Sequence, residues 1–311
     1  MNIKGFLNFN GKIYTNDKLL ISPYNRSFRY GDGCFETMKM LNGKIILEAY
    51  HVERLFTSLI ALQFNNPNYF ITDVFKKQVE EIARKNMHKK AARIRITVAR
   101  GNGGLYDVEN HHPNYVIQTW DLNSANNKFN ENGLVMDIYK DARKAYDHFS
   151  CIKSNNFLSY AMAALWAKSN QLNDALLLNS YDRICDATIA NVFMVQDGIV
   201  KTPAITEGCI GGTMRKYLLE KMKEEGIPFL ETQISVEEIM QASEVFLTNS
   251  VYGIRWVKSI GESHYKNQVS AMLFNKFATP LFDIPKKVKD PSKSFFLMQL
   301  KEPKEPKELS E

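Results

Sequence analysis

The residues with the clearest potential for covalent chemistry are a lysine, an acid and a glycine turn in the second half of the chain. Lys153 lies in the stretch Cys151-Ile152-Lys153-Ser154-Asn155-Asn156, and Asp186 and Gly211-Gly212-Thr213 follow it. A lysine that attacks a carbonyl group must first lose its proton, so it requires a partly buried position beside other dipoles. We therefore interpret Lys153 as the residue that carries a carbonyl cofactor.

If that cofactor is pyridoxal phosphate, the site has three further requirements. An acid must pair with the ring nitrogen, so that the ring can accept electrons. Backbone N–H groups, hydroxyls and an arginine must hold the phosphate, and cations or amides must orient the substrate carboxylate. The candidates are Asp186 for the acid, Arg54, Gly212–Thr213 and Ser250 for the phosphate, and Arg95 for the carboxylate. Composition and periodicity permit this set without selecting it.

The arginine candidates each have an ordinary alternative. Arg54 lies on a predicted helix over residues 49–62, where its guanidinium either lies in water or binds a phosphate with two N–H groups. Arg93 and Arg95 share one face of a predicted strand over residues 92–100. On that face they are either solvated or directed at an anionic substrate.

The first half of the chain is predicted to form strands and helices around two hairpins. Asn10-Gly11 and Asn42-Gly43 are strong hairpin signals. Gly31 and Gly33 interrupt a loop that leads into the second hairpin, and such glycines let a backbone approach a ligand or a strand closely. The predicted elements are strands over 6–9, 12–14, 37–41, 44–47, 92–100 and 115–120, and helices over 49–62 and 71–88.

The second half alternates strands and helices. Asn155 or Asn156 is predicted to cap a helix that runs through Leu165. Its expected apolar positions are Phe157, Leu158, Ala161, Met162 and Leu165. Glycines before Thr213 open another helix, whose N-terminus is suited to bind an anion. Strands are predicted over 134–139, 174–178, 190–196, 199–202 and 244–248. Further helices are predicted over 214–225 and 269–281, and a short one begins with a capping box at Ser235-Val236-Glu237-Glu238.

The length of 311 residues favours two domains, because one ordinary small core would not accommodate the chain. The polar run over residues 123–132 is the best candidate for a linker. It would separate an N-terminal α/β domain at 1–122 from a C-terminal domain at 133–285. Residues 286–311 are rich in Lys, Glu and Pro and are predicted to form a disordered tail.

Composition excludes several classes of function. The 44% hydrophobic and 24% charged residues are typical of a globular protein, and no apolar run approaches the roughly 20 residues of a membrane span. The N-terminus lacks a secretory signal, so a cytoplasmic location is expected. The net charge of +6 forms no basic stripe, which disfavours nucleic-acid binding. Four scattered cysteines indicate neither a disulfide framework nor a metal site.

Five motifs occur in order along the chain. They are Gly31-Asp32-Gly33-Cys34-Phe35-Glu36-Thr37, His51-Val52-Glu53-Arg54-Leu55, Lys153-Ser154-Asn155-Asn156, Asp186 through Asn191-Val192-Phe193, and Gly212-Thr213-Met214-Arg215. Over about residues 5–282 the chain resembles the class IV aminotransferase family, which includes branched-chain and D-amino-acid aminotransferases and aminodeoxychorismate lyases. The resemblance implies a two-domain α/β (α+β) enzyme of fold type IV. Its C-terminal domain would be a pseudo-barrel, and its pyridoxal 5'-phosphate would lie in a cleft between the domains, completed by a second subunit.

The resemblance also assigns roles to individual positions. Lys153 matches the catalytic lysine that forms the Schiff base. The cofactor-binding positions are Arg54, Asp186, Gly212, Thr213, Ser250 and Asn191. The substrate-binding positions are Arg95, Glu36 and Val251. No metal ligand is implied.

Two positions depart from the family pattern. Asp186 stands where the family usually has glutamate, so the backbone must come closer to the ring nitrogen or a water must bridge the gap. Met214 stands where many members have threonine, which removes one phosphate hydroxyl. Some lyase members also have methionine there.

The resemblance implies transamination between an amino acid, branched-chain-like or D-amino-acid-like, and a 2-oxo acid, with Lys153 as the general base. The alternative is an aminodeoxychorismate lyase that releases pyruvate and 4-aminobenzoate. The run Arg100-Gly101-Asn102-Gly103-Gly104 resembles lyase members, whereas Leu105 stands where some lyases have an arginine, and Glu36 and Arg95 also occur in aminotransferases.

A non-enzymatic carrier is disfavoured, because lysine, acid and arginine are all present. The expected partners are small-molecule amino and oxo acids and a second copy of the chain, with no nucleic acid and no membrane.

Overall fold

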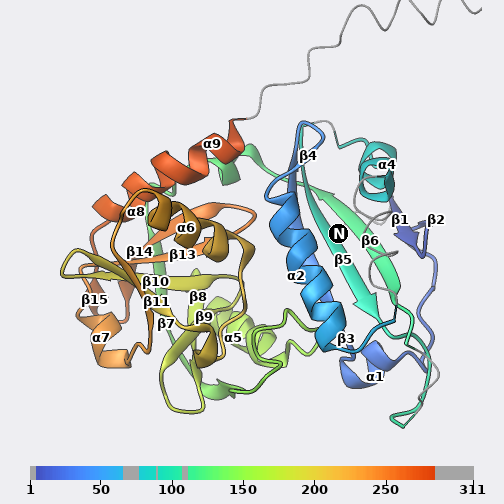
Figure 1. Ribbon diagram of the computed structural model, residues 1–311, viewed down its shortest axis with the longest axis horizontal. Coiled ribbons are helices and arrows are strands. Elements are labelled where there is room, and N and C mark those ends of the chain that lie inside the picture. The colour runs from blue at the N-terminus through green and yellow to red at the C-terminus, as the bar shows by residue number, and fades with distance from the viewer. Residues whose placement is uncertain (1–4, 66–76, 89, 107–110, 284–311) are drawn as a thin grey trace, which may run out of the picture.

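The computed structural model of the protein describes residues 5–65, 77–88, 90–106 and 111–283, which form two sheets with helices around them (Figure 1). The first sheet is antiparallel and has six strands in the order β2-β1-β6-β5-β3-β4. Its strands are β1 (Phe6–Phe9), β2 (Lys12–Thr15), β3 (Gly33–Leu41), β4 (Lys44–Ile45), β5 (Ala91–Ala99) and β6 (Asn114–Asp121). Both predicted hairpins are confirmed, with all four Asn and Gly residues of their turns at positive φ.

The two faces of this sheet have different partners because side chains alternate along a strand. On β3, Cys34 and Met38 point into a core that also contains Leu55 and Leu59 of α2 (Glu48–Ala61). The predicted helix over residues 71–88 is described only from residue 77, where α4 (Val79–Lys85) packs against the same core. The opposite face of β3 and β5 remains available for a site.

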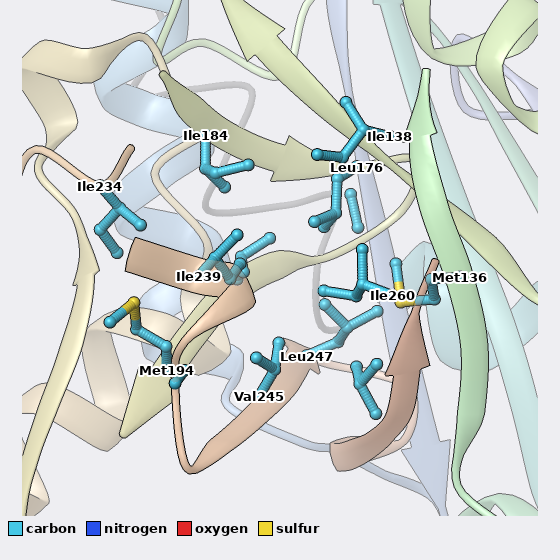
Figure 2. Packing of buried hydrophobic residues seen from close by; sticks show 14 of the residues in the cluster. Met136, Ile138, Leu176, Ile184, Met194, Ile234, Ile239, Val245, Leu247 and Ile260 are labelled. Atoms are coloured by element: carbon cyan, nitrogen blue, oxygen red, sulfur yellow. The ribbon is translucent and has the colours of Figure 1, made fainter. Parts of the chain in front are cut away.

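The second sheet has nine strands and curls around an apolar interior (Figure 2). The strand order is β12-β11-β10-β13-β14-β7-β8-β9, and β15 pairs with β14. The strands are β7 (Leu134–Lys144), β8 (Asp174–Asn179), β9 (Ile184–Ala187), β10 (Asn191–Gln196), β11 (Ile199–Pro203), β12 (Phe229–Thr232), β13 (Glu244–Asn249), β14 (Gly253–Ile260) and β15 (Ser263–His264).

Alternation along the strands separates the interior of this sheet from its helix-covered exterior. Val245 and Leu247 point into the interior, together with Ile234 and with Ile239 of α7 (Val236–Met240) (Figure 2). Phe246, between them on β13, packs instead in the core on the outer side of the sheet. The end strand β9 also contacts β10 and β11, which lie toward the other end of the strand order, so the sheet curls back on itself. The predicted pseudo-barrel is thereby confirmed.

Helices cover the exterior of the second sheet. They are α5 (Leu158–Ser169), α6 (Thr213–Glu224), α8 (Gln268–Leu273), the π-helix η4 (Phe274–Ala278) and α9 (Thr279–Phe282). The capping box at Ser235 and Glu238 is confirmed. The helix predicted over residues 269–281 is confirmed, because α8, η4 and α9 follow one another without a break, with a π-helical turn in the middle.

Two expectations for α5 are wrong. No asparagine side chain caps the helix, since Phe157 holds the N-cap position and the Asn155 amide donates instead to Ser27 and to the Val98 carbonyl. The helix also buries a different face from the one predicted. The expected apolar residues Leu158, Met162 and Leu165 are 70%, 43% and 61% exposed, and small residues with Tyr160 pack against the sheet instead.

The predicted linker over residues 123–132 contains the short 3-10 helix η2 (Ser124–Asn127) and contacts β14 closely. Asn130 exchanges hydrogen bonds with the backbone and indole of Trp256. The predicted tail over 286–311 lies outside the described residues. Among the helices that are described, none is long and apolar enough to cross a membrane.

Candidate active site

A pocket of about 450 Å³ lies between the free face of the first sheet and the loops at one end of the second. The first sheet and its helix contribute Phe35, Thr37, Arg54, Arg93 and Arg95 to the lining. The second contributes Lys153, Phe157, Tyr160, Asp186–Asn191, Ile210, Gly212, Thr213, Thr248–Tyr252 and Arg255. The pocket therefore brings together nine of the ten site residues that were expected from the sequence.

Lys153 reaches the pocket from a segment that is tied to the first sheet. Its carbonyl accepts a hydrogen bond from the Phe35 N–H at 2.9 Å, and the Asn155 N–H donates to the Gly33 carbonyl. The Lys153 Nζ lies 4.7 Å from the centroid of the Phe35 ring and 5.2 Å from that of Phe157. The lysine of the second half is thus held against a strand of the first half.

The environment of Lys153 favours the neutral amine. Burial lowers the pKa of Lys153 from 10.5 to about 7, and the nearby charge of Arg54 acts in the same direction. The carboxylates of Glu36 and Asp186 oppose this shift. An amine that loses its proton near neutral pH can act as a nucleophile or as a general base.

Asp186 is held at the pocket by donors from four segments of the chain. Its Oδ2 accepts from the Tyr160 hydroxyl at 2.7 Å, from the Ile210 N–H at 2.9 Å and from Lys144 Nζ at 3.3 Å. Its Oδ1 accepts from the Asn191 amide at 2.9 Å, the only partner of this atom among the described residues. A carboxylate oxygen can accept a second hydrogen bond, so Oδ1 can also accept from a ring N–H.

The start of α6 forms one end of the pocket. Gly212 is the N-cap and no side chain caps the helix, so its first N–H groups can bind an anion. A Cβ atom at Gly212 would lie 1.8 Å from Asn191 Oδ1, which explains the glycine at this position. Met214 is buried in the core behind this turn and does not line the pocket.

Arg54 projects toward the same turn and is fixed from behind. Its Nε and Nη2 donate to the two oxygens of Glu36 at 2.7 and 2.6 Å, and its Nη1 donates to the Gly211 carbonyl at 3.1 Å. Glu36 also contacts the buried His51, whose Nδ1 lies 2.6 Å away. The guanidinium retains N–H groups for a ligand because it has five donors.

Glu36 is the one expected site residue that does not line the pocket. It alternates with Phe35 and Thr37 along β3 and therefore faces α2, where it is 1% exposed. This placement suits a residue that positions Arg54 better than one that contacts a substrate. The alternation was already visible in the sequence.

Ser250 and Val251 line the pocket in the loop after β13. The Ser250 hydroxyl donates to the Thr37 carbonyl at 2.8 Å, so it must turn away from this carbonyl to donate to a ligand. The Val251 carbonyl accepts from the buried Lys39 Nζ at 2.8 Å. These contacts fix the loop against β3.

Three arginines form a further wall of the pocket. Arg95 lies with its guanidinium carbon 3.7 Å from the centroid of the Phe35 ring, and Arg93 is two residues away on the same face of β5. Arg255 comes from β14 and donates to Asn126 Oδ1 at 2.8 Å. Arg93 and Arg95 both line the pocket, and Arg93 is also exposed to solvent, so the two alternatives that the sequence left open both apply to Arg93.

The residues that sequence reasoning missed are Tyr160, Lys144 and Arg255. Tyr160 and Lys144 contact Asp186, and their separation from it by 26 and 42 residues leaves no local signal. Arg255 reaches the pocket from a strand that carried no expected function.

The residues present fit pyridoxal phosphate. Asp186 Oδ1 can accept a ring N–H, the α6 turn with Arg54 and Thr213 can hold the phosphate, and Lys153 has a neutral amine for the carbonyl. No group of three or more His, Cys, Asp or Glu that could hold a metal occurs among the described residues.

Comparisons with known proteins agree on one protein family. A family model described as "Amino-transferase class IV" matches residues 33–260. An aminodeoxychorismate lyase of Vibrio harveyi is 27% identical over 246 residues, which cover 78% of this chain and 88% of the lyase.

Two solved structures share the fold. A branched-chain aminotransferase of Thermoproteus uzoniensis with norvaline has a TM-score of 0.77 and 20% identity, and the match covers 92% of this chain and 96% of that one. A hypothetical aminotransferase of Mycobacterium tuberculosis, in its PLP-bound form, has a TM-score of 0.75 and 15% identity, with 90% of this chain and 99% of that one covered.

Proposed function

Because the chain belongs to the class IV aminotransferase family, we propose that it is a pyridoxal-phosphate-dependent transaminase that acts on small amino and 2-oxo acids. The observation that carries this proposal is Lys153, whose pKa is lowered to about 7 in a pocket shared with Asp186 and the α6 anion turn. A lysine with only a structural role is not expected to combine a lowered pKa with an acid and an anion-binding turn in one pocket.

Each residue has a distinct task in this proposal. Arg54 and the N–H groups of Gly212 and Thr213 would bind the cofactor phosphate, and Ser250 lies in the same lining. The Asp186 carboxylate would accept a hydrogen bond from the protonated ring nitrogen of the cofactor. The cofactor supplies an electron sink next to the α-carbon of the substrate. We assign Asn191 to the support of Asp186, to which it donates.

Lys153 performs the proton transfer. Its neutral Nζ removes the proton from the α-carbon of the substrate and holds it, because an amine of pKa about 7 can both accept and return a proton near neutral pH. Phe35 and Phe157 flank this atom and limit the access of water. Arg95 orients the substrate carboxylate, and Val251, which also lines the pocket, contacts the substrate.

The two sheets correspond, in our proposal, to two domains at 1–122 and 133–285 joined by the linker at 123–132. We also propose that the protein is a homodimer. The exposed apolar residues Leu158, Met162 and Leu165 of α5 are suited to an interface between two copies.

A second candidate function is the aminodeoxychorismate lyase reaction, which the arginine wall favours. The substrate of this reaction carries two carboxylates, and three arginines of the pocket have no carboxylate partner among the described residues. The same removal of a proton by Lys153 would be followed by elimination, which yields 4-aminobenzoate and pyruvate.

A paired assay distinguishes the two candidates. The purified, cofactor-loaded protein is tested for glutamate formation from amino acids with 2-oxoglutarate, and separately for pyruvate release from aminodeoxychorismate. The Lys153→Ala variant should lose both activities. It should also lose the visible absorption that borohydride abolishes in the wild type. Absence of cofactor binding under saturating supply would refute the proposed function as a whole.

A further inference from the structure

The parts of the site that would hold a phosphate come from two different sheets. Arg54 lies on α2, which packs against the first sheet, and the turn at Gly212 and Thr213 begins α6, which covers the second. The hydrogen bond from Arg54 Nη1 to the Gly211 carbonyl joins them directly at 3.1 Å. The two helices can still rotate about this bond, so the distance between the guanidinium and the turn depends on how α2 packs against α6.

A second set of contacts joins α2 to α6 outside the pocket. The Tyr50 hydroxyl donates to Glu220 Oε2 at 2.5 Å, across 170 residues of the chain. The ring of Tyr50 also meets the ring of Tyr217 edge to face, with the centroids 5.9 Å apart and an interplanar angle of 88°. Beside them, Lys216 Nζ lies 2.6 Å from both carboxylate oxygens of Glu53. The part of the pocket lining that the structure describes contains none of these residues, so their side chains serve the contact between the helices.

The spacing of these residues connects the contact to the phosphate end of the pocket. Arg54 follows Tyr50 by about one helical turn, so both lie on one side of α2. Glu220 follows Thr213 by about two helical turns, so both lie on one side of α6. A displacement of Glu220 from Tyr50 would therefore move the α6 turn away from Arg54.

The Tyr50–Glu220 hydrogen bond is the stronger of the two polar contacts. The side chains of Lys216 and Glu53 are 46% and 58% exposed, and an exposed ion pair contributes little. Tyr50 and Glu220 are half-buried, and burial, together with the bond to Glu220, raises the pKa of Tyr50. The hydroxyl therefore keeps its proton and donates to a carboxylate, a bond roughly twice as strong as one between neutral groups. Because the phenol is uncharged, the contact adds no cation that would compete with Arg54 for an anion.

We propose that Tyr50 and Glu220 are positioning residues that clamp α2 to α6 and so hold Arg54 at the distance from the α6 turn that a phosphate group requires. They do not touch the ligand and act through Arg54 and the turn. This inference rests on the proposed function in taking the ligand to be phosphorylated. The clamp should therefore affect recognition of the phosphate group and not of the rest of the ligand.

The end of the pocket that carries Lys153 does not depend on the clamp. The loop after β13 is joined to β3 through Thr37 and Lys39, and the Lys153 carbonyl accepts from the N–H of Phe35 on the same strand. Loss of the Tyr50 hydroxyl should therefore leave this end assembled while it loosens the phosphate end.

Two forms of the cofactor that differ only in the phosphate group test the clamp. Pyridoxal phosphate and pyridoxal are titrated into the full-length chain, and the dissociation constant of each is measured from the visible absorption. Tyr50→Phe keeps the ring contact with Tyr217 and removes the hydroxyl. It should weaken binding of pyridoxal phosphate by about tenfold, because roughly one charge-assisted hydrogen bond to the phosphate is lost, and change binding of pyridoxal by less than about twofold.

Variants at Glu220 show whether the effect comes from the hydrogen bond itself. Glu220→Ala should match Tyr50→Phe, and the double variant should bind no more weakly than either, because both changes remove the same bond. Glu220→Gln keeps an acceptor oxygen and should restore most of the affinity. Glu224→Ala is the matched control and should bind pyridoxal phosphate as the wild type does, since it removes from the same helix a carboxylate that pairs with Lys221 and not with α2.

Two results would overturn the clamp. One is a Tyr50→Phe variant that binds pyridoxal phosphate as the wild type does, or that loses affinity for both forms equally. The other is a double variant in which the two losses add. If the wild type binds neither form, the proposed function fails, and isothermal titration with inorganic phosphate then decides on the clamp. A phosphate affinity that is unchanged in Tyr50→Phe overturns the clamp as well, whereas a loss of about tenfold supports it.

Discussion

Replacement of Glu36 tests how the site is built, because the Glu36 carboxylate holds Arg54 in position. It is 1% exposed and binds Arg54 through two hydrogen bonds and His51 through a third. Glu36→Gln keeps the size of the side chain and removes its charge. Arg54 would then remain largely buried without a counter-charge, a change that costs about 3–5 kcal/mol in comparable buried pairs.

The pKa shift of Glu36 gives a second, independent value for the free energy that this ion pair contributes to folding. Burial alone would raise the pKa of Glu36, but Arg54 and His51 outweigh it and lower the pKa from 4.5 to about 2. This shift corresponds to about 3 kcal/mol of folding free energy above pH 4.5. The contribution is lost as the pH falls from 4.5 toward 2, because the unfolded chain then binds a proton that the folded chain does not.

Urea unfolding of the wild type and Glu36→Gln measures both effects. At pH 7 the variant should be less stable by about 3 kcal/mol, and the gap should narrow below pH 4.5. Its affinity for the cofactor should also fall, because Arg54 is no longer oriented. The control is Asp182→Asn, which breaks the exposed ion pair with Arg143 and should cost less than about 1 kcal/mol. A Glu36→Gln loss as small as the control, or a gap independent of pH, would refute this account of the ion pair.

Three further predictions concern the pocket directly. Acetylation of Lys153 in the cofactor-free protein, followed by mass spectrometry, should be half-maximal near pH 7; a midpoint near 10 would contradict the effect of burial and Arg54. Gly212→Ala should lower the affinity for the cofactor phosphate by about tenfold or more, because the new Cβ would lie 1.8 Å from the Asn191 side chain. Gly104→Ala is the control: nothing lies within 4 Å of its Cβ, so equilibrium binding of the cofactor should not change. Tyr160→Phe removes one donor to Asp186 Oδ2 and should lower kcat by about tenfold. A kcat equal to that of the wild type would contradict a catalytic role for this hydrogen bond.

Much of the local structure could be predicted from the sequence because its causes are local. The two Asn-Gly turns need left-handed backbone that few other residues adopt, and the Ser235–Glu238 capping box satisfies N–H groups within one turn. The cap of α5 failed for the converse reason. The amide of Asn155 found partners at Ser27 and Val98, more than fifty residues away in the chain, and these partners outweighed the local interaction.

The sequence by itself determined the family, the fold class and most residues that could surround the cofactor, because these depend on residue types in a fixed order. Only the tertiary structure decided how they are used. It decided which face of β3 borders the pocket, so that Phe35 lines the pocket and Glu36, on the other face, packs against α2. It brought Tyr160 and Lys144 to Asp186. It also gathered arginines from two sheets on one wall, because such proximity depends on how the sheets pack and not on spacing along the chain.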